Sequence, residues 1–191
     1  KPVEYIIDLM NSLVKSGKII KFGASNWTAK RINKANEYAK KAGLNGFSAS
    51  QIRFNPAYCV GERAGLVGMD STEFEFYKKN NFPVVAYSSL AKGFFSKMHE
   101  FGEAGLSDKA RARYLCDENI ERLKVLEKLS KKYETSIAGI ISGAFSSFEI
   151  PKVFPIIGPS RIEQLEDSLG GADVEIKKEE LEEIFKFSIV Q

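Results

Sequence analysis

The stretch Pro83-Val84-Val85-Ala86-Tyr87 decides the fold, because it is the clearest β-strand in the sequence. β-branched and aromatic residues favour strands, and this run is apolar throughout its centre. Similar short apolar runs predict three further strands, at residues 19–23, 47–51 and 153–157. We therefore expect four short strands, each apolar enough to be buried in a sheet.

Apolar residues at helical spacing predict helices before, between and after these strands. Thr28 is expected to cap one helix that ends at Gly43, and Asp70 to cap another with Glu73 as its partner. The stretch from residue 88 to about residue 105 is expected to be irregular and to be the most mobile segment. The predicted helices cover residues 3–16, 28–43, 70–80, 120–133, 137–145, 160–169 and 178–187.

The alternation of strands and helices predicts an α/β fold with parallel strands and crossover helices. Four such units make either a small open sheet or half of an eight-stranded TIM barrel, and the alternation alone does not separate these two. A complete barrel needs ~250 residues, more than the 191 of this chain. No low-complexity linker or internal repeat divides the sequence, so residues 1–191 are expected to form a single domain.

Composition excludes several classes of protein. Hydrophobic residues at 43%, charged residues at 28% and a net charge of +3 are typical of a folded protein without a nucleic-acid surface. Cys59 and Cys116 have neither disulfide nor metal-site spacing, and His99 is the single histidine, so a histidine-rich metal site is excluded. The sequence has no apolar run of membrane-spanning length and no signal peptide at its start, so a cytoplasmic location is expected.

Polar and aromatic residues follow each predicted strand, where parallel α/β folds bind their ligands. The four segments are Gly23-Ala24-Ser25-Asn26-Trp27, Ala49-Ser50-Gln51, Ala86-Tyr87-Ser88-Ser89-Leu90 and Ile157-Gly158-Pro159-Ser160-Arg161. They suit a planar, amide-bearing, phosphorylated ligand. Together they resemble the aldo-keto reductase family from about residue 3 to residue 169, which implies the C-terminal half of that family's barrel.

The resemblance gives the first two strand ends a role. Ser25, Asn26 and Gln51 match the residues that hydrogen-bond the nicotinamide carboxamide in this family. Asn and Gln side chains supply both the donor and the acceptor that an amide needs. The alternative is that Ser25 and Asn26 only turn the chain and that Gln51 is a polar residue at a sheet edge.

Tyr87 matches the aromatic residue that stacks on the nicotinamide ring in this family; the alternative is a core tyrosine with a satisfied hydroxyl. The following turn resembles Tyr-Ser-Pro-Leu-Ala-x-Gly, although Ser89 stands where proline is common. Glycine there permits close approach of the backbone to a phosphate. The resemblance assigns the pyrophosphate to the backbone of this turn, at Ser88, Ser89, Leu90 and Gly93. It also assigns Lys97, which lies one residue away from the family's usual Gly-Lys spacing.

The last motif resembles Gly-x-Ser-x-x-x-Gln-Leu-x-Glu-Asn, which holds the adenosine end of the cofactor. A helix N-terminus with a hydroxyl and an arginine suits the 2′-phosphate of NADP(H). The alternative is a capping box formed by Ser160 and Glu163. Asp167 and Ser168 depart from the usual Glu-Asn. The residues implied are Gly158, Ser160, Arg161, Gln164, Asp167 and Ser168.

The resemblance implies an oxidoreductase that transfers hydride between NADPH and small aldehyde or ketone substrates. The family's catalytic Tyr, Lys, Asp and His precede the matching region, and no tyrosine here has a Lys/Asp/His set around it. We therefore expect an NADP(H)-binding half of a reductase that is inactive alone. Two alternatives stay open: a non-catalytic nucleotide-binding or regulatory module of the same family, and an unrelated four-stranded α/β domain.

A half barrel would leave sheet edges and inward-facing residues uncovered. We expect Phe22, Val85 and Ile157 to face inward without an opposing layer. Open edges and apolar faces are association surfaces, so the chain is expected to self-associate.

Overall fold

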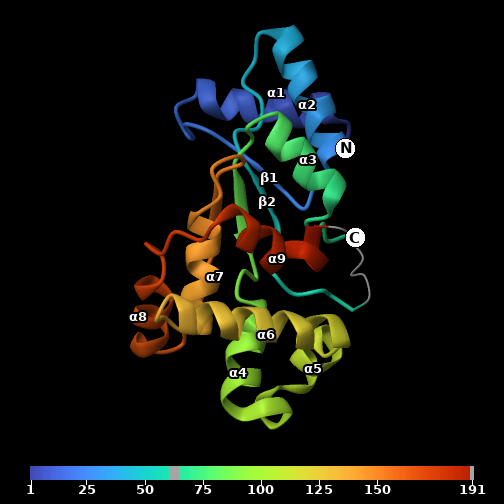
Figure 1. Cartoon of the computed structure of the whole chain (residues 1–191). Coiled ribbons are helices and arrows are strands. Elements are labelled where there is room, and N and C mark those ends of the chain that lie inside the picture. Colours follow the sequence, from blue (N-terminus) through green and yellow to red (C-terminus); the bar gives the residue numbers. More distant parts are fainter. Residues whose placement is uncertain (61–64, 190–191) are drawn as a thin grey trace.

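A computed structural model describes residues 1–60 and 65–189 of the chain, with side chains up to residue 186 (Figure 1). The strands are β1 (Ala24–Ser25), β2 (Ser50–Arg53), β3 (Val84–Tyr87) and β4 (Val153–Pro155). The α-helices are α1 (Val3–Lys15), α2 (Ala29–Ala42), α3 (Ser71–Lys79), α4 (Phe94–Phe101), α5 (Asp108–Tyr114), α6 (Asp117–Lys132), α7 (Ile137–Ser146), α8 (Ile162–Gly170) and α9 (Lys178–Ile189). Two 3₁₀ turns cover Ala91–Gly93 and Gly102–Gly105.

The four strands form one parallel sheet in the order β1-β2-β3-β4. This order confirms the predicted α/β fold with parallel strands and crossover helices. Figure 1 shows α1, α2 and α3 gathered near β1 and β2, and α4, α5 and α6 at the other end of the molecule. Because parallel strands share one direction, all four carboxyl ends lie at one edge of the sheet.

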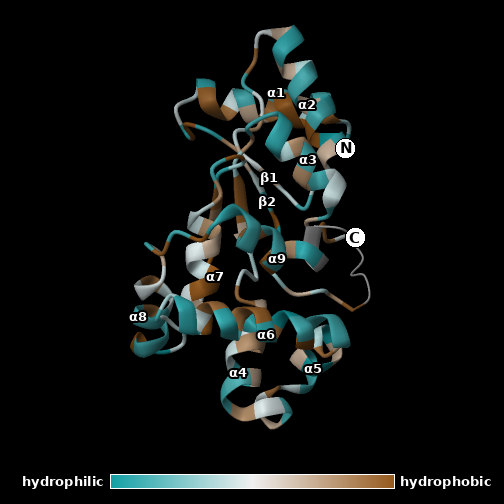
Figure 2. Ribbon diagram, viewed as in Figure 1, coloured by the Kyte–Doolittle hydropathy of each residue, from teal (hydrophilic) through white to brown (hydrophobic). Residues whose placement is uncertain are grey.

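The two faces of the sheet differ in burial. Residues alternate along β2 and β3, so that Ser50, Ile52, Val84 and Ala86 are buried beneath helices. The intervening residues are only partly covered. Figure 2 shows hydrophobic residues along the strands in the middle of the molecule and hydrophilic residues along much of α2 and α6.

The open face carries one row of residues in register across the sheet. Ser25 pairs with Gln51, Gln51 with Val85, and Val85 with Phe154. The Phe154 side chain is 56% exposed. This face is therefore a mixed polar and apolar surface in the described chain.

The expected bounds of three strands were wrong. Residues 19–23 are not a strand, and Ile20 is 88% exposed, although the Phe22 carbonyl accepts a hydrogen bond from the Ser48 amide. The second strand begins three residues later than predicted, at Ser50, and the fourth ends two residues earlier, at Pro155. The apolar run at 19–20 lies in a loop, so hydrophobicity there did not indicate sheet pairing.

The stretch 88–105, expected to be irregular, is mostly helical. It contains α4 between the two 3₁₀ turns, and the side chains of Phe94 and Phe95 are fully buried. Gly93 has a φ of 73° and Gly102 a φ of 60°, so glycines delimit the helix. Burial of two adjacent aromatic rings stabilises the helix between these glycines.

Phe22 was wrongly expected to lack a covering layer. Its side chain is buried, and its ring packs edge-to-face on Phe47 with centroids 5.5 Å apart. Val85 and Ile157 are partly exposed, as an open face requires.

Glu73 joins α2, α3 and β2 in the core. Its buried carboxylate accepts hydrogen bonds from the Ala29 amide at 2.8 and 3.1 Å and from the Tyr77 hydroxyl at 3.0 Å. Tyr77 also contacts the Ser50 hydroxyl at 3.0 Å. Asp70 caps α3 as predicted, by accepting from the Glu73 amide, but the Glu73 side chain reaches the start of α2 instead of returning to Asp70.

Candidate functional site

Asn26 is the polar centre of the site at the carboxyl ends of β1, β2 and β3. Its Oδ1 accepts hydrogen bonds from the Tyr87 hydroxyl at 2.9 Å and from the Val67 amide at 3.1 Å. Its backbone amide donates to the Gln51 carbonyl at 3.0 Å, and its φ is 55°, in the left-handed region. Asn tolerates that conformation better than most residues, which explains an Asn directly after β1.

Ser25 and Gln51 lie beside this centre. They are register partners in β1 and β2, and the Ser25 hydroxyl accepts a hydrogen bond from the side-chain Nδ2 of Asn26 at 3.4 Å. The Gln51 side chain is on the open face, two residues before the end of β2. The structure therefore brings Ser25, Asn26, Gln51 and Tyr87 together, although they come from three separate strand ends.

The turn after β3 has an unusual backbone. Ser88, Ala91 and Lys92 have φ values of 54°, 47° and 58°, and Gly93 continues the left-handed run with 73°. The Ser89 hydroxyl is buried and donates to the Ile156 carbonyl at 2.6 Å, so this side chain joins β3 to the segment after β4. Any contact of Ser89 with a ligand would therefore come from its backbone.

The Lys97 side chain passes over Gly93. A Cβ atom at Gly93 would lie 3.7 Å from the Lys97 Cε, and Lys97 is exposed. Leu90 is partly exposed between these residues and the strand. The predicted pyrophosphate contacts thus lie within one turn of chain and the first turns of α4.

The motif after β4 is exposed to solvent apart from one serine. Arg161 occupies the N-cap position of α8 without a side-chain cap, and the Ser160 amide donates to Gln164 Oε1 at 2.9 Å. This geometry contradicts the Ser160–Glu163 capping box. Ser168 is buried, and its hydroxyl donates to the Gln164 carbonyl at 2.8 Å, so its side chain faces its own helix. Gly158 and Asp167 are exposed.

Side-chain caps distinguish the helices that follow the four strands. Thr28 caps α2 and Asp70 caps α3, and both helices follow β1 and β2. After β3 and β4, the N-termini of α4 and α8 have Gly93 and Arg161 at the N-cap and no side-chain cap. At α8, amides without a cap at the helix N-terminus favour an anion. At α4 the preceding 3₁₀ turn already uses the first amides, because Gly93 and Phe94 donate to the Leu90 and Ala91 carbonyls.

Arg53 belongs to this site and was missed by the sequence analysis. It pairs with Tyr87 in register and lies on the same face as Gln51, two residues further along β2. The period of two along a strand would have placed it there. The signal was present in the sequence, but no motif drew attention to it.

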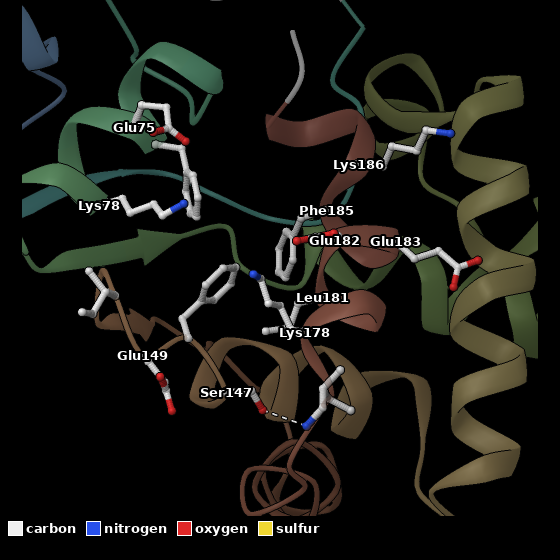
Figure 3. Close-up of a pocket in the computed structure, with 14 residues that line it drawn as sticks. Glu75, Lys78, Ser147, Glu149, Lys178, Leu181, Glu182, Glu183, Phe185 and Lys186 are labelled. Atoms are coloured by element: carbon white, nitrogen blue, oxygen red, sulfur yellow. Dashed lines mark hydrogen bonds between the residues drawn. The ribbon is translucent and has the colours of Figure 1, made fainter.

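A cavity of about 1020 Å³ lies away from these residues, between α3, α7 and α9 (Figure 3). Phe74, Phe148 and Phe185 line it, together with Glu149 and Ile150, which precede β4. It lies in the helical layer behind the sheet, where Phe148 and Phe185 pack on Phe54, the residue after β2. Within residues 1–60 and 65–189, no group of three or more His, Cys, Asp or Glu residues could hold a metal ion, and no helix there is long and apolar enough to cross a membrane.

Comparisons with known proteins agree with this arrangement. The model of the "Aldo/keto reductase family" matches residues 1–189. The chain is 28% identical over 183 residues to norsolorinic acid reductase A of Aspergillus parasiticus, which covers 95% of this chain and 44% of that protein. It is 26% identical over 189 residues to the aldo-keto reductase yakc [NADP(+)] of Schizosaccharomyces pombe, covering 96% of this chain and 52% of that protein. The chain thus spans about half the length of the curated relatives it matches.

A solved structure shares the fold. The crystal structure of a thermostable aldo-keto reductase in complex with the inhibitor epalrestat superposes with a TM-score of 0.66 at 21% identity, over 98% of this chain and 55% of that chain. An unrelated α/β domain, the third alternative from the sequence, is therefore excluded. A family match over nearly every residue, together with the shared fold, establishes that this chain belongs to the aldo/keto reductase family.

Proposed function

We propose that this chain is the NADP(H)-binding half of an aldo-keto reductase barrel, folded as one domain. The whole protein would transfer hydride between NADPH and the carbonyl group of a small aldehyde or ketone. The convergence of Asn26, Gln51 and Tyr87 at one sheet edge is the observation that carries this proposal. The nicotinamide carboxamide would contact Ser25, Asn26 and Gln51, and its ring would stack on Tyr87.

The hydrogen bond between Tyr87 and Asn26 supports this assignment. It fixes the aromatic ring relative to the amide that would bind the carboxamide. A preorganised ring and amide reduce the entropy lost when a planar ligand is bound. The cofactor itself would supply the hydride, while these side chains would orient the ring.

The cofactor phosphates are assigned to the turn after β3 and to α8. The left-handed backbone at Ser88 and at Ala91–Gly93, with the exposed Lys97, suits a pyrophosphate. At α8 the uncapped N-terminus, the Ser160 hydroxyl and the Arg161 guanidinium suit a 2′-phosphate. Gln164, and with it Asp167 and Ser168, would lie nearest the adenosine. This favours NADP(H) over NAD(H).

The half-barrel assignment rests on the open sheet face and its two edges. In the described residues β1 and β4 each pair with a strand on one side only. The row from Gln51 to Phe154 is only partly covered, and α8 exposes Ile162, Leu165 and Leu169 on one side. A second set of four βα units would cover these surfaces.

The proton donor is assigned to the other half of the barrel. His99 contacts Glu127 at 2.8 Å on the surface, and Tyr38 contacts Asp8, so these groups are engaged away from the strand ends. The alternative, a non-catalytic nucleotide-binding module, uses the same cofactor contacts and differs in whether the whole protein turns over a carbonyl. The expected cytoplasmic location stays a prediction.

A fluorescence titration with NADPH and NADH tests the proposal directly. The purified protein should bind NADPH, and Gln51→Ala should weaken this binding while Glu149→Ala, at the opposite end of the sheet, should not. Absence of NADPH binding by the wild-type protein would contradict the proposal. Binding that is insensitive to Gln51, Asn26 and Tyr87 would contradict the site.

A further inference from the structure

Arg53 lies at the carboxyl end of β2, two residues beyond Gln51, which is assigned to the nicotinamide. Ser25, Gln51, Val85 and Phe154 form one row across the open face, and Arg53 with Tyr87 forms the next row toward the carboxyl edge. A ligand carbonyl presented to a nicotinamide ring on Tyr87 would approach from this direction.

The backbone around Arg53 is fixed on the side away from Tyr87. The Arg53 amide donates to the Val67 carbonyl at 3.1 Å, and its carbonyl accepts from the Met69 amide at 2.8 Å. Residues 67–69 therefore continue the sheet next to β2, beyond the end of β1. Their position is also tied to the site, because the Val67 amide donates to Asn26.

The guanidinium group is held over Gly68. A Cβ atom at residue 68 would lie 2.4 Å from Arg53 Nη2 and 3.0 Å from its Cζ. Any larger residue at this position would displace the guanidinium. The lack of a side chain at residue 68 thus lets Arg53 lie flat against the loop while remaining partly exposed.

Arg53 has no acidic partner in the described chain. Within residues 1–60 and 65–189 no carboxylate lies within 4.0 Å of its guanidinium, whereas Arg111 is paired with Glu103. A guanidinium presents donors in a planar fork that matches a carboxylate, and a partly buried one gains most from such a partner. A cation in this position therefore favours an anionic ligand group.

The position of Arg53 indicates which anion it meets. The cofactor phosphates are assigned to the turn after β3 and to α8 after β4, and Arg53 is on β2, on the opposite side of Tyr87. We propose that Arg53 binds a carboxylate of the substrate, so that the reductase acts on carbonyl compounds that also carry a carboxylate. This inference rests on the proposed function, and it adds the substrate class and the residue that selects it.

The test compares an aldehyde that carries a carboxylate with the same aldehyde whose carboxyl group is masked as a methyl ester. The NADP⁺-loaded protein is titrated, by calorimetry or by NMR of the arginine side chains, with 2-carboxybenzaldehyde and with its methyl ester. Wild-type protein should bind the acid at least about tenfold more tightly, the difference expected of a charge-assisted bidentate contact. Arg53→Met should abolish the preference and Arg53→Lys should retain part of it. Arg31→Met is the matched control, since the Arg31 guanidinium already stacks on the Trp27 ring at 3.7 Å and donates to the Lys1 carbonyl at 3.2 Å.

The outcomes separate this inference from the proposed function. Equal binding of acid and ester, or a preference that survives Arg53→Met in a protein that still binds NADP⁺, overturns the role of Arg53 alone. A loss of NADP⁺ affinity in Arg53→Met, with circular dichroism unchanged, would assign the guanidinium to the cofactor and also overturn it. A wild-type protein that binds no NADP(H) would remove the proposed function and this inference together.

Discussion

The Tyr87 hydroxyl donates a 2.9 Å hydrogen bond to Oδ1 of Asn26, 61 residues earlier in the chain. This contact links the ends of β3 and β1 across β2. It ties the orientation of the ring to the orientation of the amide, and a second donor, the Val67 amide, holds the same oxygen.

Tyr87→Phe should weaken NADPH binding without removing the stacking ring. The Asn26 amide would lose one of its two fixed donors, and a hydrogen bond of this kind contributes about 1 kcal/mol, or roughly fivefold in affinity. Fluorescence titration measures the change. Tyr5→Phe, at an exposed tyrosine on α1, is the control, and an unchanged affinity in Tyr87→Phe would show that the contact does not organise the site.

Arg161→Ala should remove most of the preference for NADPH over NADH. A charged contact to the 2′-phosphate is worth roughly 1.5–3 kcal/mol, enough for a tenfold or larger preference. The ratio of the two dissociation constants gives the answer, with Lys152→Ala before β4 as control. If the ratio is unaffected, Arg161 does not bind the phosphate.

The chain by itself should not reduce carbonyl compounds. General acid catalysis contributes about 10²–10⁴-fold, and the alignment of hydride and carbonyl also depends on groups assigned to the other half of the barrel. The check is NADPH oxidation with a broad aldehyde panel, alongside a complete aldo-keto reductase under the same conditions. Sustained turnover by these 191 residues would place a proton donor within them.

The isolated chain should self-associate through the uncovered face and edges of its sheet. Phe154 and Ile156 near β4 and Ile162 on α8 are exposed apolar side chains. Light scattering from dilute to concentrated protein should show a rising mass, and Phe154→Lys should reduce it. A monodisperse monomer at every concentration would count against the half-barrel assignment.

The stability of the fold should depend on the titration of Glu73. Burial raises the pKa of this carboxyl above its usual value of 4.5, against the lowering effect of the Ala29 amide and the Tyr77 hydroxyl. A raised folded-state pKa means that the folded protein binds this proton more tightly than the unfolded chain does. The free energy of unfolding should therefore fall as the pH rises from 4.5 through the folded-state pKa.

Urea unfolding at several pH values tests this, with Glu73→Gln compared with Glu75→Gln. Only the first substitution should flatten the pH dependence, because Glu75 is exposed on α3. The same slope in both variants would mean that another group is responsible.

The fold class, the parallel direction of the strands and most helices could be predicted from the sequence because their signals are local. The strand at Val84–Tyr87 and the caps at Thr28 and Asp70 lie where predicted. The first strand was misplaced because hydrophobicity does not report strand pairing, which begins only after the apolar pair Ile19-Ile20. Helix α4 was missed because its stability comes from the burial of Phe94 and Phe95 in the core, which depends on tertiary packing.

The candidate site could be predicted as a set of residue types at strand ends, but not as a set of contacts. Nothing near Tyr87 in the sequence indicates that its hydroxyl would meet Asn26. Ser168 shows the converse: it stands where the motif usually has asparagine, and its hydroxyl is directed at the Gln164 carbonyl of its own helix. Side-chain direction depends on tertiary packing, which one sequence does not display.

The carboxylate of Glu73 at the first amide of α2 has a consequence for how a cofactor can lie. A helix N-terminus at this edge of the sheet would otherwise attract a phosphate, and here it already holds a negative charge supplied by the protein. With Asp70 capping α3 in the same way, neither of these two helix N-termini is open to a phosphate. A dinucleotide with its nicotinamide at Tyr87 would then extend toward β4. Two acidic side chains that it does not contact would favour this orientation across the sheet.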